Sequence, residues 1–300
     1  MMKNIRFTGV MPALVTPFDA EGHVRRATVK SLMDWQLSAG MKGFYICGST
    51  GEGPALMRST RMEMAEAAVE AAGGRGAIID HIGAPNILDT LALVRHATEI
   101  GVDALSSLAP TYSFRYNEDE LVDYYRLISD NTDKPVLVYA TEAMGVDSFP
   151  RLMSRLIEIP NVIGVKFTIH DYFEMRKTRE VNGGDINLIN GPDETLLCGL
   201  VMGADGGIGT TYNVMPECFV QLYDAYTAGD LATAQACQYK INRVIDALIR
   251  HSQFGAIRAT KAALRLKGFD VGDACYPARA FDADRMAALK KELSELGVEF

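Results

Sequence analysis

Short apolar segments alternate with segments of helical character along most of the chain. Each apolar segment is a nearly continuous run bounded by Gly, Pro, Asn or Asp, which is typical of a strand buried on both faces. Several of the helical segments end in glycine, as helices commonly do. The pattern predicts eight strands, at residues 9–18, 43–50, 77–83, 102–110, 135–140, 162–168, 186–194 and 204–213.

Strand followed by helix, repeated eight times, predicts an α/β protein with the fold of a (β/α)8 TIM barrel. A doubly wound parallel sheet is the competing architecture. From about Asp230 the alternation ends, and helices follow one another without a strand between them. We therefore expect a barrel with the active site over residues 1–229. A C-terminal helical extension over residues 230–300 would pack on the barrel as part of a single structural unit.

Helix starts are also visible in the sequence. Asn117 stands before the acidic residues 118–120, and Ser59 stands before Glu63. Side-chain oxygens at N-caps and acidic residues in the first turn both stabilise a helix start. These patterns predict N-caps at Asn117 and Ser59, and Asp282 begins the last predicted helix in the same way.

Composition and charge indicate a compact protein that acts on a small molecule. Of the 300 residues 48% are hydrophobic and 23% are charged, and the formal charge of −8 argues against a nucleic-acid partner. No apolar run is long enough for a signal peptide or a membrane span, and the five cysteines form no C-x-x-C pair. We expect a cytoplasmic protein with reduced thiols. The scattered histidines predict no metal cluster, and residues 206–213 lack the third glycine of a dinucleotide fingerprint, so no cofactor is expected.

Lys166 stands out because it lies near the end of the apolar run V-I-G-V-K-F-T at residues 162–168. In such surroundings an ammonium group loses hydration, so it must find a partner, reach water or lose its proton. One interpretation is a lysine that snorkels to the barrel mouth or pairs with a carboxylate. The other is a Schiff-base lysine, whose uncharged amine attacks a ketone. The iminium so formed accepts electrons from a neighbouring carbon–carbon bond without a metal.

Other polar residues fall at the ends of predicted strands, where the βα loops of a barrel form the active-site mouth. Tyr139 is either a core tyrosine with a satisfied hydroxyl or a proton carrier. Ser49 and Thr50 lie between glycines and form either a tight turn or a binding site for a carboxylate. Asp193 and Glu194 either begin a helix or accept hydrogen bonds from the hydroxyls of a polyol.

Taken together, these motifs resemble the N-acetylneuraminate lyase and dihydrodipicolinate synthase family of pyruvate-dependent class I aldolases. The resemblance runs nearly end to end. Its marks are G-S-T-G-E at 48–52, Tyr139, V-K-F-T around Lys166, G-x-D-E at 191–194 and G-A-D-G-G-I-G-T-T-Y-N at 203–213. It implies a barrel with C-terminal helices, usually assembled as a homotetramer, that acts on a small oxo acid and sugar substrate without a cofactor or metal.

The resemblance also implies roles for individual residues. Lys166 would form the Schiff base, Tyr139 would carry a proton, and Ser49 and Thr50 would hold the substrate carboxylate and complete the catalytic set. The substrate-binding residues that it implies are Ser49, Thr50, Thr168, Gly191, Asp193, Glu194, Gly209 and Thr210.

Within this family the lyase branch is favoured. In that branch the acidic pair that corresponds to Asp193 and Glu194 binds the polyol tail of sialic acid, and G-S-T rather than G-T-T stands at 48–50. The synthase branch usually carries an arginine after the tyrosine strand, and residues 139–145 contain none. The expected reaction is the reversible cleavage of N-acetylneuraminate to N-acetylmannosamine and pyruvate.

Three alternatives remain open. The first is an aldolase for 2-keto-3-deoxy sugar acids or hydroxy-oxo acids, and the second is a 4-hydroxy-tetrahydrodipicolinate synthase. The third is a sugar-acid-binding or regulatory protein without turnover.

Departures from the family pattern predict an altered proton relay. The family commonly has Y-N-x-P after the fifth strand, whereas this chain has Y-A-T-E from Tyr139 and is one residue shorter in that loop. Ser113, beside Tyr112, aligns with a tyrosine that in relatives reaches across a dimer interface. Thr210 replaces a serine and keeps its hydroxyl.

Overall fold

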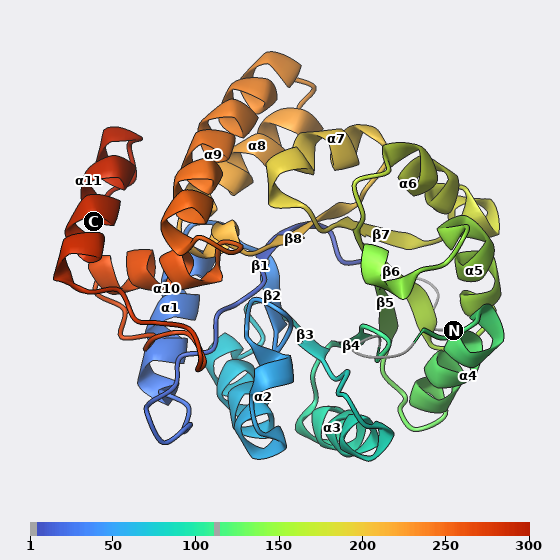
Figure 1. Cartoon of the computed structure of the whole chain (residues 1–300). Coiled ribbons are helices and arrows are strands. Elements are labelled where there is room, and N and C mark those ends of the chain that lie inside the picture. The colour runs from blue at the N-terminus through green and yellow to red at the C-terminus, as the bar shows by residue number, and fades with distance from the viewer. Residues whose placement is uncertain (1–4, 111–114) are drawn as a thin grey trace.

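The computed structural model describes residues 5–110 and 115–300, and these residues form a TIM barrel (Figure 1). Eight parallel strands lie in the order β1-β8-β7-β6-β5-β4-β3-β2 within the described residues. A parallel bridge between Ala13 and Tyr45 joins the two ends of the sheet and closes the ring. The strands are β1 Gly9–Pro12, β2 Gly43–Ile46, β3 Ala77–His81, β4 Ala104–Ser107, β5 Val136–Thr141, β6 Val162–Thr168, β7 Asn187–Asn190 and β8 Gly206–Gly209. The barrel prediction is confirmed, and the doubly wound alternative is wrong.

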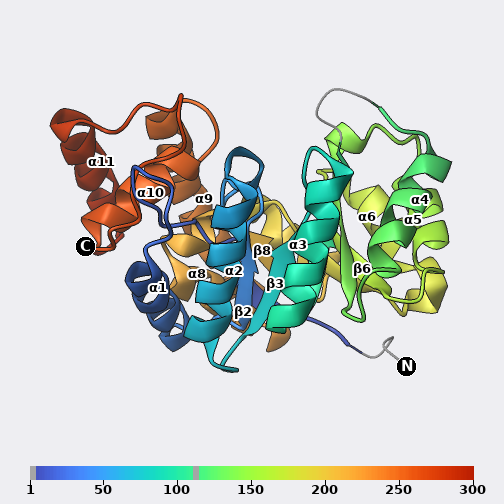
Figure 2. The same cartoon turned by 90° about the horizontal axis from the view of Figure 1, so that it is seen from below.

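Helices surround the strands and run alongside the barrel axis, as α2 and α3 do in Figure 2. Short 3₁₀ turns at Gly53–Ala55, Glu142–Met144, Asp193–Thr195 and Thr211–Asn213 follow β2, β5, β7 and β8. These turns shape the loops at the mouth. The barrel helices are α1 Arg26–Ser38, α2 Arg58–Ala72, α3 Ile87–Ile100, α4 Glu118–Ser129, α5 Phe149–Leu156, α6 Tyr172–Arg179, α7 Leu196–Val201 and α8 Pro216–Thr227.

Apolar side chains pack on both faces of the strands. Residues that point outward join the layer between the sheet and the helices, and residues that point inward form a separate cluster inside the barrel. Ile79, Leu137 and Ile189 belong to the inner cluster and are at most 1% exposed. Burying side chains of this size stabilises the fold by about 1.5–3 kcal/mol each. The filled interior leaves the C-terminal ends of the strands as the place for a site.

Helices α9 Leu231–Ser252, α10 Ile257–Leu266 and α11 Ala283–Glu295 follow the barrel and gather on one side of it, as the orange and red segments of Figure 1 show. Helix α9 packs against α8, and α10 and α11 pack against α9. The expectation that C-terminal helices follow the barrel is confirmed.

Local helix starts are partly as expected. Asn117 forms a capping box with Glu120, because its side chain accepts from the Glu120 backbone N–H and the Glu120 carboxylate accepts from the Asn117 N–H. The N-cap prediction at Ser59 is wrong. Helix α2 begins at Arg58 after an extended N-cap residue, Met57. The 3₁₀ turn that ends at Ala55 brings the chain into the helix two residues earlier than the polar pattern indicates.

Candidate active site

Lys166 points into the barrel interior close to its mouth. It lies opposite Tyr139 in the register of β5 and β6, and it is 5% exposed. Its Nζ atom lies 4.0 Å from the centroid of the Tyr139 ring and 4.5 Å from that of Tyr45. In the part of the chain that the structure describes, the amine thus lies over aromatic rings and not beside a carboxylate. This placement favours the interpretation of Lys166 as a reactive amine over that of a salt-bridged lysine.

The two tyrosines beside Lys166 have opposite electrostatic environments. Their rings are 6.0 Å apart in an edge-to-face arrangement. Burial raises the pKa of Tyr45 well above its ordinary value, and the hydrogen bond that its hydroxyl donates to Ser106 Oγ does not offset this. Burial also raises the pKa of Tyr139, but the charge of Lys166 and hydrogen bonds with Ser49, Lys166 and Thr168 outweigh it, so the net pKa is lowered. Of the two hydroxyls, that of Tyr139 is therefore the more acidic and the better suited to exchange a proton with a ligand.

His81, to which the sequence assigned no function, is a third aromatic residue in this region, beside Tyr45 and Tyr139. It is buried at the end of β3, and its ring is edge-on to that of Tyr139 at 5.9 Å. Burial, with the charges of Arg61 and Lys166, holds the pKa of His81 well below its ordinary value, so the imidazole is neutral. Its Nε2 accepts a hydrogen bond from the Leu108 N–H at 3.1 Å. His81 therefore ties the end of β3 to the loop after β4.

The loop after β2 brings Ser49 and Thr50 to the mouth. Cys47 and Glu52 both adopt left-handed backbone conformations, with φ of 55° and 57°, and so turn the chain sharply on either side of these two residues. Thr50 Oγ1 lies 2.7 Å from Thr210 Oγ1, which links the β2 loop to the β8 loop across the mouth. Ser49 is exposed, whereas Thr50 is buried.

Glu52, part of the G-S-T-G-E motif, holds this loop against the C-terminal extension. Its Oε1 accepts from Lys261 Nζ of α10 at 2.8 Å, and its Oε2 accepts from the Cys275 N–H at 2.6 Å. Lys261 is 1% exposed. Burial lowers the pKa of Lys261, although the Glu52 charge and hydrogen bond oppose the shift. No short-range sequence signal connects residues so far apart, so this pair could not be predicted from the sequence.

Asp193 organises the β8 loop. Its carboxylate accepts from the Thr210 N–H at 3.2 Å and from the N–H and hydroxyl of Thr211, both at 2.6 Å. Burial raises the pKa of Asp193 to about 6, against the opposing effect of these hydrogen bonds. A Cβ at Gly209 would lie 2.0 Å from Asp193 Oδ1, so the glycine permits this approach. The structure thus shows Asp193 in contact with Thr210, another predicted site residue.

Glu194 lies at the rim of the mouth. Its Oε1 is 3.0 Å from His170 Nε2, in the segment after β6. Thr168 and Gly191, which were also predicted to bind substrate, lie between the buried lysine and this rim. A Cβ at Gly191 would come within 1.9 Å of Thr168 Oγ1, so only glycine fits there. The sequence-predicted residues therefore gather at one end of the barrel, while Tyr112 and Ser113 lie outside the described residues.

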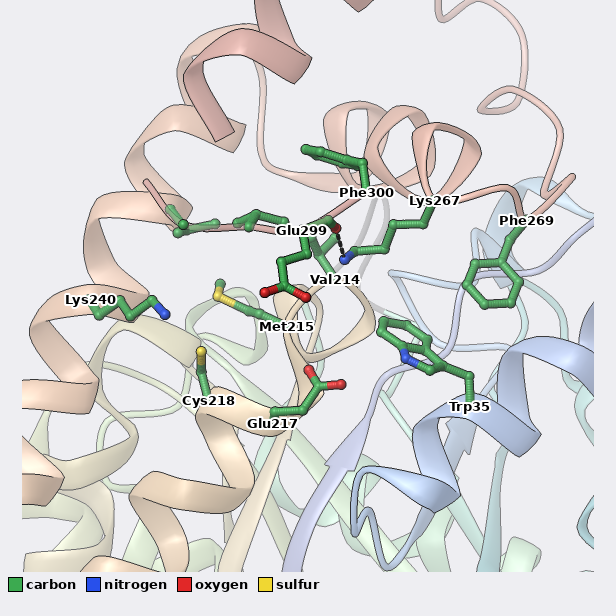
Figure 3. A pocket seen from close by; sticks show the side chains of 13 residues that line it. Trp35, Val214, Met215, Glu217, Cys218, Lys240, Lys267, Phe269, Glu299 and Phe300 are labelled. Atoms are coloured by element: carbon green, nitrogen blue, oxygen red, sulfur yellow. Dashed lines mark hydrogen bonds between the residues drawn. The ribbon is translucent and has the colours of Figure 1, made fainter. Parts of the chain in front are cut away.

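A pocket of about 580 Å³ lies away from this mouth, between α1, α8, α9 and the C-terminal segment (Figure 3). Trp35, Cys218, Lys240 and Lys267 are among its lining residues. Lys267 donates a hydrogen bond to the Glu299 carbonyl, as the dashed line in Figure 3 shows. None of the predicted site residues lines this pocket. Among the described residues no group of His, Cys, Asp or Glu is arranged to hold a metal ion.

The fold and the residues at its mouth define a TIM-barrel protein with a buried lysine on β6. The chain belongs to the Dihydrodipicolinate synthetase family, whose model matches residues 6–296. It is 34% identical over 291 residues to a protein named N-acetylneuraminate lyase from Rhizobium meliloti, covering 97% of this chain and 95% of that protein.

Solved structures agree with this assignment. A Proteus mirabilis N-acetylneuraminate lyase has a TM-score of 0.92 at 30% identity, and the match covers 98% of this chain and 100% of that one. A Ruminococcus gnavus sialic acid aldolase described as a catalytic lysine mutant has a TM-score of 0.91 at 29% identity, with 97% of each chain covered.

Proposed function

We propose that this protein is a class I aldolase that reversibly cleaves N-acetylneuraminate to N-acetylmannosamine and pyruvate. The observation that carries the proposal is the buried amine of Lys166 between Tyr45 and Tyr139, at the C-terminal end of β6. The names of the relatives and structural neighbours support the same reaction.

In the proposed mechanism, Lys166 Nζ attacks the C2 ketone of the open-chain sugar acid, and water leaves to form an iminium. Ser49, Thr50 and their backbone N–H groups hold the adjoining carboxylate. Tyr139 accepts the proton of the C4 hydroxyl as the C3–C4 bond breaks, and the bond electrons move into the iminium. The products are the aldehyde sugar and an enamine, which is protonated and hydrolysed to pyruvate, restoring the amine.

Further along the substrate, Thr168, Gly191, Gly209 and Thr210 would line the middle of the chain. Glu194, placed by the loop that Asp193 organises, would accept hydrogen bonds from the terminal hydroxyls. Glu142 is a second carboxylate at this rim, with its Oε1 3.9 Å from His170 Nδ1. Two carboxylates suit a neutral polyol tail and repel an aldehyde with its own carboxylate, which argues against the synthase alternative.

The experiment that tests the reaction separates enzyme from binding protein. The protein is incubated with pyruvate, reduced with borohydride and examined by mass spectrometry, and a pyruvyl adduct is expected on the peptide that contains Lys166. Lys166→Met should give no adduct. Coupled assays with N-acetylneuraminate, with 2-keto-3-deoxygluconate, and with pyruvate plus aspartate semialdehyde then identify the substrate. Wild-type protein without an adduct would refute an aldolase of this class.

We also propose a homotetramer in the cytoplasm. Phe173, Val201 and Tyr239 lie on the neighbouring helices α6, α7 and α9 and are 73%, 56% and 60% exposed. Exposed apolar side chains on adjacent helices are suited to a protein–protein contact. None of the helices in residues 5–110 and 115–300 has both the length and the apolar character needed to cross a bilayer. Light scattering of the purified protein measures the assembly state.

Finally, we propose that the barrel at 1–229 and the extension at 230–300 form one structural unit. The buried contact between Glu52 and Lys261 supports this. So does Gln238 of α9, whose side chain donates to the Asp193 carbonyl at 3.2 Å and accepts from the Leu197 N–H at 2.9 Å. Two loops at the mouth are therefore supported by the extension.

A further inference from the structure

His170 is a feature of the mouth that the proposed mechanism does not use. It stands two residues after β6, between the loops that follow β5 and β7, and its imidazole is flanked by two carboxylates. Nε2 lies 3.0 Å from Glu194 Oε1, within hydrogen-bond distance, whereas Nδ1 lies 3.9 Å from Glu142 Oε1, which is beyond it.

The backbone on each side of this contact is held in place. Asp171, the next residue, caps α6 by accepting from the Glu174 N–H at 2.9 Å. On the other side, the Glu194 carbonyl accepts from Asn242 Nδ2 of α9 at 3.0 Å. Two backbone segments held in this way bring the imidazole and the carboxylate together, and the motion that remains is rotation of the two side chains.

A hydrogen bond from Nε2 restricts that rotation. It occupies Oε1 of Glu194 and leaves Oε2 free to accept a hydroxyl. Without the imidazole, the half-exposed carboxylate turns freely in water, and its ordering on binding then costs part of the affinity. The contact is open to water in the free protein, so its influence should show when a ligand covers it.

We propose that His170 is a positioning residue that orients the Glu194 carboxylate and so sets the preference for substrates with a long hydroxylated tail. This inference rests on the proposed aldolase function and extends it to a residue outside the reaction centre. His170 would act on binding of the tail and leave the bond-breaking steps at Lys166 and Tyr139 unchanged.

The test compares His170→Ala and His170→Gln with wild type on two oxo-acid substrates. One is N-acetylneuraminate, and the other is a short 4-hydroxy-2-oxo acid without a polyol tail. We expect His170→Ala to raise KM for N-acetylneuraminate about fivefold or more with kcat within twofold, and to leave the short substrate unaffected. His170→Gln keeps an N–H donor and should restore most of the loss. In a Glu194→Gln background, His170→Ala should cause less than a twofold further change, because both act through one contact.

The chain offers a matched control in His96, whose Nε2 lies 3.2 Å from Glu66 Oε1 between α3 and α2, away from the mouth. His96→Ala should leave both KM values unchanged. Equal effects of His170→Ala on long and short substrates, or independent effects of His170 and Glu194, would overturn the inference.

Pyruvate trapping on Lys166 in every variant separates the two proposals. Trapping without tail discrimination by His170 overturns this inference alone. Wild-type protein that traps pyruvate but cleaves no sugar acid overturns both the inference and the proposed substrate, since there is then no tail to hold. Absence of trapping in wild type overturns the aldolase proposal, and it therefore also overturns this inference.

Discussion

Replacing Lys261 tests whether the extension supports the mouth. Its Nζ lies 2.8 Å from Glu52 Oε1, and the two side chains are 1% and 9% exposed. Lys261 also donates to the Asp273 carbonyl at 2.8 Å. Removing one partner of a buried ion pair leaves the other charge uncompensated, which destabilises a protein by about 3–5 kcal/mol. We therefore expect Lys261→Met to lower the free energy of unfolding by about that amount.

The assay is urea unfolding followed by circular dichroism, with pyruvate trapping as a second measurement. Because Glu52 follows directly on the loop of Ser49 and Thr50, trapping should weaken together with stability. A double variant, Glu52→Gln with Lys261→Met, removes both charges and keeps an acceptor for the Cys275 N–H. It should be more stable than the sum of the single losses indicates, by at least about 1 kcal/mol.

A matched control is Lys30→Met, because Lys30 pairs with Asp34 on the exposed surface of α1, where ion pairs contribute little. Its unfolding midpoint should match that of wild type. A loss below about 1 kcal/mol in Lys261→Met would show that the buried pair does not anchor the extension to the β2 loop.

Three further predictions concern the mouth and strand β3. Tyr139→Phe should lower kcat by a factor of about 10²–10⁴ while pyruvate trapping on Lys166 persists, because the proton carrier is lost but the amine remains; unchanged kcat would assign the proton to another group. Gly191→Ala places a Cβ 1.9 Å from Thr168 Oγ1, so it should destabilise the protein by about 1–3 kcal/mol and raise KM for the sugar acid, as measured by thermal unfolding and steady-state kinetics. Burial raises the pKa of Asp80 from 3.8 to about 7, and the opposing charge of Arg61 offsets only part of this shift. Between about pH 4 and pH 7 the folded state therefore holds a proton on Asp80 that the unfolded state has released. The contribution of Asp80 to the free energy of unfolding should then fall by up to about 4 kcal/mol as pH rises from about 4 to 7. In urea unfolding measured at several pH values, Asp80→Asn should lack this part of the decrease.

Much of the barrel follows from local pattern. Seven of the eight strands lie within their predicted ranges, and β5 ends one residue beyond its range, because parallel strands covered on both faces read as apolar runs. Six of the strand ends were placed too late, whereas β6 ends as predicted and β5 ends one residue later than predicted. The run at 43–50 stays apolar or small past Ile46, yet the chain leaves the sheet at Cys47, where φ is 55°. Composition alone does not distinguish the last strand residue from a loop that folds back over the barrel.

The candidate site is also predictable in part: its local sequence signals could be read from the sequence, and its long-range contacts could not. A lysine in an apolar strand and a tyrosine at the end of the preceding strand are local signals, and the structure places Lys166 and Tyr139 side by side. The contacts of Asp193 with Thr211, and of Glu52 with Lys261, join residues distant in the chain. Each member alone reads as an ordinary helix-start acid or a surface lysine, so only the folded arrangement reveals them.

The dependence of the mouth on residues near the C-terminus has a consequence for biosynthesis. A growing polypeptide on the ribosome has all its β-strands long before Gln238, Lys261 and Cys275 emerge. Until then the loops after β2 and β7 lack their supports. Newly made molecules should therefore gain the ability to turn over substrate only as translation finishes.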